Sequence, residues 1–259
     1  MRFSLIYSQE NVAGKNIVEK IKRMAFMPHI PIIEVKKEVL YTDITKEKFP
    51  QLHTVDYVVF PSVHKSKDNK PALCLHAPGN WRNADFGGKE GKACMSSAFV
   101  MKYLFCELQK NAHTIDQQYQ ITLEATHHGP LCTIPCCFIE IGSTDREYND
   151  REAIHCIAKT ILSLQSYIPH KSWIPAIAIG GPHYAPNFNK IQGQSNYAIS
   201  HVLPSYALPL TENMLKEAEE KTKEHIKTVI IDWKGCGTAE TRQKYIEIIK
   251  KQKLEFIRA

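Results

Sequence analysis

The chain has 259 residues, with 33 basic and 27 acidic side chains, so its formal net charge is +6, and 12 histidines add positive charge on mild acidification. A hydrophobic content of 43% with 23% charged residues is typical of a globular protein and excludes disordered and fibrous classes. The longest mainly apolar runs, such as Trp173 to Ile179, fall far short of the roughly eighteen residues that cross a bilayer. We therefore expect no membrane helix.

The N-terminus and the cysteines point to the compartment. The first residues lack the positive region, long apolar stretch and small-residue cleavage site of a signal peptide, so we expect the protein to stay in the cytoplasm. The eight cysteines include no Cys-x-x-Cys pair, the spacing that zinc or redox sites commonly use. In a reducing compartment we expect most of them to be small, buried, apolar residues.

Apolar runs that favour strands alternate with helical patterns along the chain. In chain order, the sequence predicts a strand at Phe3–Tyr7, a helix at Asn11–Met24, strands at Val55–Phe60 and Ala72–His76, a helix at Ser96–Gln109, strands at Tyr119–Ala125 and Cys136–Ile141, a helix at Arg151–Tyr167, a strand at Ile174–Ile179, a helix at Thr211–Lys223, a strand at Val229–Asp232 and a helix at Glu240–Lys251. This alternation predicts an α/β fold with a central, mostly parallel sheet, whose ligands usually lie beyond the carboxyl ends of strands.

Two local details refine these elements. Either Asn149 or Asp150 can cap the helix that starts at Arg151. The run at Ile174–Ile179 is nearly all apolar and is followed by two glycines, which is typical of a strand covered on both faces.

Four of the expected strand ends carry histidine together with glycine or proline. These segments are 60–66 with His64, 75–80 with His76, 124–130 with His127 and His128, and 180–186 with His183, and a fifth segment at 200–206 contains His201. One such histidine is more often a structural residue, but five segments of this kind are harder to explain in that way. If the strands are neighbours, the imidazoles meet in one cleft and supply metal ligands or acid–base groups.

Two carboxylates accompany the histidines. Glu124 stands three residues before His127 and, on a continuous strand, would point to the opposite face unless the following turn reverses it. Adjacent His127 and His128 would, for the same reason, not both face one ion. Glu140 lies in an apolar strand and needs a partner if buried, for which a structural salt bridge is at least as good an explanation as catalysis.

Other motifs exclude some chemistry. The glycine pair at 180–181 allows close approach of a ligand, but neither it nor the pair at 87–88 fits Rossmann or P-loop spacing, so we expect no nucleotide cofactor. No serine sits in a Gly-x-Ser-x-Gly elbow, which disfavours a serine hydrolase. The stretch from Ala153 to Thr211 has no acidic residue, which suits either a polyanion or a buried Pro/Gly-rich segment, and composition leaves both open.

Taken together, these motifs resemble the D-aminoacyl-tRNA deacylase family of the archaeal and plant type. The segments that carry the resemblance are 61–66, 71–80, 86–89, 124–130, 138–144, 180–186 and 201–206. Thr-His-His-Gly-Pro at 126–130, followed by Glu-Ile-Gly-Ser-Thr at 140–144, is the most specific part. Pro182 and Ser200 stand where the family usually has glycine.

The resemblance implies a single deacylase domain spanning residues 1–259, with a three-layer α/β/α architecture similar to the phosphorylase and peptidyl-tRNA hydrolase group. It implies hydrolysis of the ester between a D-amino acid and tRNA, as part of translation quality control, with zinc as cofactor. The partner is D-aminoacylated tRNA, and the enzyme is expected to act as a cytoplasmic monomer without membrane contact.

Site residues follow from the same resemblance and from the histidine segments. We expect catalysis to involve Glu124, His127, His128, His183 and His201, with His127, His183 and His201 as zinc ligands. Other pairs or triples of the four histidines, with Glu124 as a further ligand, remain open. So does a metal-free mechanism in which the tRNA 2′-hydroxyl or a histidine activates water. We expect substrate binding to involve His64, His76, Gly129, Gly180, Gly181, Lys65 and Lys190.

The tRNA should be held mainly through its phosphates, and binding should therefore weaken steeply with salt. The lysines expected to contact phosphate are Lys65, Lys67, Lys89, Lys171 and Lys190. Two other interpretations remain: another metal-dependent peptidase or amidase on a related fold, and a non-catalytic RNA-binding module in which the histidines are structural.

Overall fold

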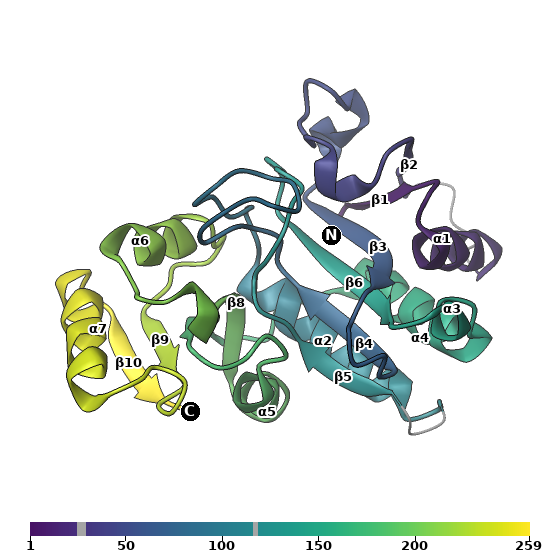
Figure 1. The fold of residues 1–259 in the computed structure, drawn as a ribbon. Coiled ribbons are helices and arrows are strands. Elements are labelled where there is room, and N and C mark those ends of the chain that lie inside the picture. The colour runs from purple at the N-terminus through teal and green to yellow at the C-terminus, as the bar shows by residue number, and fades with distance from the viewer. Residues whose placement is uncertain (25–29, 116–118) are drawn as a thin grey trace.

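The computed structural model describes residues 1–24, 30–115 and 119–259, and these form two β-sheets with helices between and beside them (Figure 1). The larger sheet has the strand order β2-β1-β3-β6-β4-β5. Its strands are β1 (Phe3–Ser8), β2 (Ile32–Val35), β3 (Tyr57–His64), β4 (Ala72–His76), β5 (Gln120–Leu123) and β6 (Cys136–Gly142). The smaller sheet has the order β10-β9-β7-β8 and consists of β7 (Ile174–Ile179), β8 (Tyr197–Leu203), β9 (Thr228–Ile231) and β10 (Glu255–Arg258).

Seven α-helices and four short 3₁₀ turns connect the strands in the described part of the chain. The α-helices are α1 (Val12–Met24), α2 (Ala98–Ala112), α3 (Asp145–Tyr148), α4 (Arg151–Leu162), α5 (Pro186–Gln194), α6 (Glu212–Glu220) and α7 (Ala239–Lys251). The 3₁₀ turns are η1 (Val39–Tyr41), η2 (Pro50–Thr54), η3 (Ser163–Ser166) and η4 (Ser205–Ala207). In Figure 1, the smaller sheet with α6 and α7 lies at the left, and the larger sheet occupies the centre and right.

Strand direction differs between the two sheets. In the larger sheet β2, β1, β3 and β6 run parallel, whereas β4 and β5 run parallel to each other but antiparallel to β6. All three strand pairs of the smaller sheet are parallel. The predicted α/β class with mixed, mostly parallel pairing is confirmed, but the division into two sheets was not predicted, because apolar runs do not tell which strands pair.

The helices α1, α2 and α4 pack on one face of the larger sheet and share one hydrophobic core with the inner face of the smaller sheet. Strand β7 shows how its sequence serves two cores. Ala176 and Ala178 point into the shared helical layer, while Ile177 and Ile179 pack with residues of α6 and α7. This alternation confirms that the run is a strand covered on both faces.

The opposite face of the larger sheet is covered differently. Segment 39–55, which includes η1 and η2, packs over Val58, Phe60 and Phe138 and forms a separate apolar cluster with them. The functional residues described below lie on this same face of the sheet, beside that cluster.

All twelve predicted elements are present; β4 and β7 have the predicted bounds, and the others have shifted ends. Strand β3 begins at Tyr57 and continues to His64, four residues beyond the prediction, and the helix predicted at Arg151–Tyr167 ends at Leu162 and continues as η3. Asp150 caps this helix, because its carboxylate accepts hydrogen bonds from the N–H groups of residues 152 and 153.

The sequence analysis missed β2, β8, β10, α3 and α5, of which all but β8 are short or begin in polar turns. All eight cysteines are free thiols, and seven of them are buried, as expected. No helix in the described ranges has the length and apolar character that crossing a bilayer requires.

Candidate active site

The predicted histidines meet on a face of the larger sheet, over the middle of β6. His64 ends β3 and His76 ends β4, but these strands run in opposite directions, so their carboxyl ends point toward opposite ends of the sheet along the strand axis. The imidazoles meet, as expected, but they do not do so beyond one shared end of the sheet. The two side chains instead extend over the same face from opposite directions and meet above Glu140.

Glu140 forms the floor of the site. It is 3% exposed, and its carboxylate oxygens lie 3.7 Å from His64 Nδ1 and 3.8 Å from His76 Nε2. Burial by itself would raise the pKa of this carboxyl group, but the close approach of the two imidazole nitrogens outweighs burial and lowers the pKa well below its usual range. Glu140 is thus an anion that orients the two histidines.

Glu124 lies next to this floor, one residue beyond β5. It is 1% exposed, and neither of its carboxylate oxygens has a hydrogen-bond partner. Its Oε1 lies 3.3 Å from His64 Nδ1 and 3.4 Å from His183 Nε2, without hydrogen-bond alignment. A buried carboxylate in this state lacks the interactions that normally compensate its desolvation, which is typical of a ligand for a cation.

His64 links the two carboxylates. Burial tends to lower the pKa of its imidazole, but the polar contact in which Glu140 accepts from the ring and the negative charges of Glu124 and Glu140 together raise that pKa above its usual value. Its other nitrogen, Nε2, lies 3.2 Å from the hydroxyl of Tyr184. Both ring nitrogens of His64 are therefore committed to protein groups.

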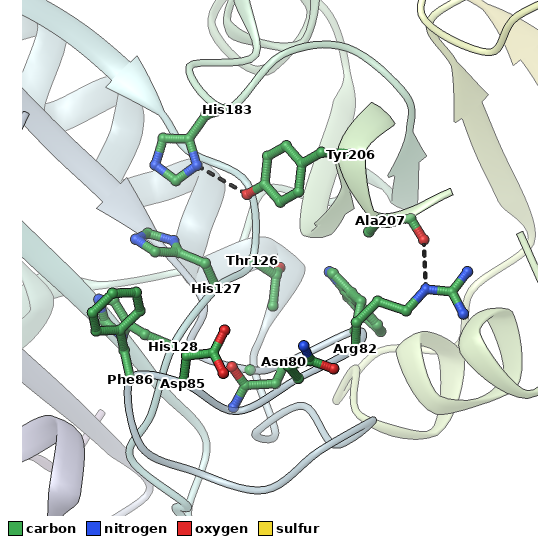
Figure 2. A pocket seen from close by; sticks show the side chains of 13 residues that line it. Asn80, Arg82, Asp85, Phe86, Thr126, His127, His128, His183, Tyr206 and Ala207 are labelled. Carbon is green, nitrogen blue, oxygen red and sulfur yellow. Dashed lines mark hydrogen bonds between the residues drawn. The ribbon is translucent and has the colours of Figure 1, made fainter. Parts of the chain in front are cut away.

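His127 and His183 present one free nitrogen each toward Glu124. The Nδ1 of His127 donates to the carbonyl of Ala125 at 2.8 Å, and the Nδ1 of His183 lies 3.0 Å from the Tyr206 hydroxyl (Figure 2). The ligand atoms of Glu124, His127 and His183 all lie within 4.8 Å of one another. Metal-binding histidines are commonly held through the second nitrogen in this way.

His76, His127 and His128 form a second group with ligand atoms within 4.8 Å of one another. The expectation that His127 and His128 would not both face one ion assumed that the strand continues through them, and it does not, because β5 ends at Leu123 and His128 adopts a positive φ of 45°. The same turn brings Glu124 and His127 together. Burial, followed by the neighbouring imidazoles, lowers the pKa of His127 well below its usual value and that of His128 to about 4. Both rings are therefore neutral near pH 7 and offer lone pairs.

His201 does not join these groups. It lies inside β8 and is fully buried, with Nδ1 3.2 Å from Thr126 Oγ1 and Nε2 3.0 Å from the carbonyl of Lys221. Burial lowers the pKa of its imidazole to about 4. Both of its nitrogens are occupied, so the structure corrects the expected ligand set: His201 holds Thr126, the neighbour of His127, and Glu124 replaces it beside the other two histidines.

The predicted glycines have packing roles. A Cβ at Gly129 would lie 2.1 Å from the carbonyl oxygen of Leu40, and one at Gly180 would lie 2.6 Å from the sulfur of Cys236. The loop that follows β7 is thus packed on the turn at 232–236 through Gly180 and Gly181, and these three glycines do not support the expected substrate contacts. Lys190 is exposed on α5 and lines neither cavity described next.

Two cavities meet at the histidines described above, and both are lined by Phe86, His127, His128 and His183. The first, of about 400 Å³, is shown in Figure 2 and is otherwise lined by the loop 79–85, Thr126 and the residues at 206–207. The second, of about 470 Å³, is otherwise lined by Glu140, by the end of β3 with His64 and Lys65, and by residues 11, 38, 40 and 41.

The sequence analysis missed Trp81, Asp85, Tyr206 and Tyr41 as lining residues. Trp81, Asp85 and Tyr41 lie outside the five histidine segments. Tyr206 lies in segment 200–206, which was selected because it contains His201.

The cluster lies at the junction of the two sheets. Beyond β5, the N–H of Ala125 donates to the carbonyl of His183 at 2.8 Å, and the N–H of Thr126 donates to the carbonyl of Val202 at 3.0 Å. These hydrogen bonds join the segment after β5, the edge strand of the larger sheet, to strand β8 and the loop after β7 in the smaller sheet. The spacing of Glu124 and His183 therefore depends on both sheets.

Comparison with known proteins decides the family. A family model described as D-aminoacyl-tRNA deacylase matches residues 51–257. The chain belongs to the D-aminoacyl-tRNA deacylase family. The resemblance drawn from the histidine segments is thereby confirmed.

Individual members of the family agree along the chain. The D-aminoacyl-tRNA deacylase of Methanocaldococcus jannaschii is 33% identical over 268 aligned positions and covers 100% of both chains. That of Thermococcus onnurineus is 36% identical, over 88% of this chain and 83% of its own. The crystal structure of a conserved protein of unknown function superimposes with a TM-score of 0.90 at 27% identity, covering 99% of this chain and 94% of the other.

Proposed function

We propose that the protein hydrolyses the ester bond of D-aminoacyl-tRNA, releasing the D-amino acid and tRNA, at a zinc site formed by Glu124, His127 and His183. Membership of the deacylase family supports the reaction. The observation that carries the site is the buried Glu124 carboxylate, whose oxygens have no hydrogen-bond partner and face the imidazoles.

These residues fit a zinc ion. Imidazole nitrogen and carboxylate oxygen are donors that zinc prefers, and three protein ligands with one open position are typical of catalytic zinc. The separation of 3.4 Å between Glu124 Oε1 and His183 Nε2 is close to the spacing of about 3.3–3.6 Å that tetrahedral bonds of about 2.0–2.2 Å require. When bound there, zinc polarises the ester carbonyl and lowers the pKa of water to about 7.

The protein's own groups hold the ligands and move the proton. His64 and Glu140 fix the position of Glu124, and the Tyr206 hydroxyl orients His183. His128 donates through Nδ1 to the carbonyl of Gly129 at 2.6 Å, which leaves its Nε2 as an acceptor at the meeting point of the two cavities.

We assign His128 the role of general base. In this reaction a bond forms between water oxygen and the carbonyl carbon while His128 Nε2 takes the proton of the water. The bond from that carbon to the ribose oxygen then breaks, and the same proton passes to the ribose oxygen.

The tRNA is held, in this proposal, through phosphate contacts with surface lysines. Lys65, Lys67, Lys89, Lys171 and Lys190 are all exposed and form no ion pair within the described residues. We also propose that the enzyme works in the cytoplasm as part of translation quality control, because its substrate is charged tRNA.

One experiment tests both parts of the proposal. D-tyrosyl-tRNA and L-tyrosyl-tRNA are incubated with the wild type, Glu124→Gln and the surface control Gln194→Ala, and bound zinc is measured by atomic emission. We expect the wild type and control to hydrolyse only the D-ester and to carry zinc, and Glu124→Gln to lose both properties. Glu124→Gln keeps the side-chain volume but replaces an anionic ligand with a neutral amide.

Each failure has a separate meaning. A wild type that does not hydrolyse the D-ester contradicts the proposed reaction. Full activity of protein stripped of metal by a chelator contradicts the zinc site but leaves the reaction intact. Hydrolysis of small acyl-amino acids or peptides in preference to the tRNA ester would favour the peptidase or amidase interpretation.

A further inference from the structure

Two exposed aromatic side chains stand at the second cavity. Tyr41 is 58% exposed and Phe86 is 64% exposed, and neither ring pairs with another aromatic ring in the described ranges. We propose that this cavity binds the 3′-terminal adenosine of the tRNA, with its base stacked on these two rings. The inference rests on the proposed function and adds to it the position of the nucleoside half of the ester.

The backbone that carries these two rings is anchored next to the active-site histidines. The carbonyl of Phe86 accepts a hydrogen bond from the N–H of Gly129 at 2.9 Å, directly after His128. The next residue, Gly87, packs so closely on η1 that a Cβ there would lie 2.0 Å from the carbonyl oxygen of Leu40 and 3.2 Å from Cδ1 of Tyr41. Exposed rings on an anchored backbone are suited to base stacking, because stacking needs a flat surface and an anchored backbone loses little freedom on binding.

The polar groups at the cavity match a nucleoside that carries one phosphate. Lys65 lines the cavity, is exposed and forms no hydrogen bond or ion pair within the described residues, so it is available to a phosphate. Glu38 lines the same cavity, and its carboxylate would repel a phosphate but accepts hydrogen bonds from an exocyclic amine or ribose hydroxyls. An aromatic surface with one lysine and one carboxylate suits an adenosine better than a stretch of phosphodiester backbone.

The first cavity has different chemistry. The Asp85 carboxylate lines this cavity together with His127 and His128 (Figure 2), and it suits the α-ammonium group, which is attached to the carbon next to the ester carbonyl. Arg82 also lines this cavity, but it donates to the carbonyls of residues 207 and 209 at 3.0 and 2.8 Å. Two of its five N–H groups are thus held by backbone carbonyls, whereas the ammonium group of Lys65 at the second cavity has no partner within the described residues.

Tyr206, the exposed aromatic residue that lines the first cavity but not the second, already contacts His183. Its hydroxyl lies 3.0 Å from His183 Nδ1, and the two rings lie nearly parallel at 26° with centroids 6.2 Å apart. The adenosine therefore fits the second cavity and the aminoacyl group the first. The ester between them then lies over His127 and His128, which line both cavities.

The test measures kcat and KM separately for two D-tyrosyl esters, one of adenosine at its 3′ oxygen and one of methanol. We expect wild type and Tyr41→Phe to have a lower KM for the adenosine ester than for the methyl ester. We expect Tyr41→Ala to raise the KM for that ester about tenfold, equivalent to about 1.4 kcal/mol, with kcat changed less than twofold and the methyl ester unaffected. Ile168→Ala, which removes an exposed side chain elsewhere, is the matched control and should behave as wild type.

The outcomes separate this inference from the proposed function. If wild type hydrolyses D-tyrosyl-tRNA but Tyr41→Ala keeps the wild-type KM for the adenosine ester, the inference is overturned and the function stands. Loss of the adenosine preference in Tyr206→Ala but not in Tyr41→Ala also overturns it, because the nucleoside would then occupy the first cavity. If wild type hydrolyses neither D-tyrosyl-tRNA nor the esters, both the function and the inference fail.

Discussion

Asn189 ties the two halves of the active site together, and its removal should weaken both folding and metal binding. Its side chain accepts a hydrogen bond from the N–H of Leu123 at 2.6 Å and donates to Thr122 Oγ1 and the carbonyl of Tyr184, both at 2.9 Å. Leu123 directly precedes Glu124, and Tyr184 directly follows His183. One amide on α5 therefore sets the separation of two proposed zinc ligands.

The magnitude follows from the groups that Asn189→Ala leaves unpaired. The buried N–H of Leu123 lies at the free edge of β5 and loses its partner, which costs about 1–3 kcal/mol. The two donated hydrogen bonds contribute about 1 kcal/mol each, and the better helix propensity of alanine offsets about 0.6 kcal/mol. We expect the free energy of unfolding to fall by about 2–4 kcal/mol and zinc affinity by about tenfold, the lower end of the usual range for residues that orient metal ligands.

Urea unfolding followed by circular dichroism measures the stability, and competition with a chromophoric chelator measures the zinc affinity. Gln194→Ala, on the same helix but exposed and without a side-chain hydrogen bond, is the control and should stay within about 0.5 kcal/mol of wild type. Wild-type stability and zinc affinity in Asn189→Ala would refute the reasoning that this amide fixes the site.

Three further predictions concern other residues. His201 has a folded pKa of about 4 against 6.5 in the unfolded chain, so protonation favours unfolding. Urea unfolding should show that wild type loses about 2 kcal/mol more stability between pH 7 and pH 5 than His201→Asn does, and zinc content unchanged in that variant would support a structural role. Gly129→Ala should lower the melting temperature, because its Cβ would meet the carbonyl of Leu40 at 2.1 Å, and a wild-type melting curve would contradict this packing. Binding of D-aminoacyl-tRNA, measured by filter retention, should fall steeply from 50 to 200 mM salt and less steeply for Lys65→Ala, whereas identical slopes would remove Lys65 from the phosphate contacts.

The sequence predicted the elements well wherever pattern and end signals agreed. Strand β4 was predicted with its observed bounds, and Asp150 was one of the two caps foreseen for α4. The sequence signal was weaker for β8, because the polar residues Ser200 and His201 interrupt its run of apolar residues. Polar residues within a strand hide its apolar periodicity, although here their side chains are hydrogen-bonded inside the fold.

The site was predicted in part for a related reason. His127, His183 and Glu124 were identified because residue type alone indicates metal or acid–base chemistry. His201 was grouped with them by the same criterion, yet its environment makes it structural. Residue type gives the chemical capacity of a side chain, whereas its hydrogen-bond partners decide whether that capacity is free.

The sequence by itself determined the fold class, twelve of the helices and strands, and the family, because these depend on local patterns and on motifs that are contiguous in the chain. Only the tertiary structure decided which side chains share a site. Because β4 pairs with β6 in antiparallel orientation, His76 and His64 extend over one face of the sheet from opposite directions. The turn after β5 brings Glu124 close to His127 and His183. Both depend on strand pairing and backbone direction between distant segments, which apolar periodicity does not encode.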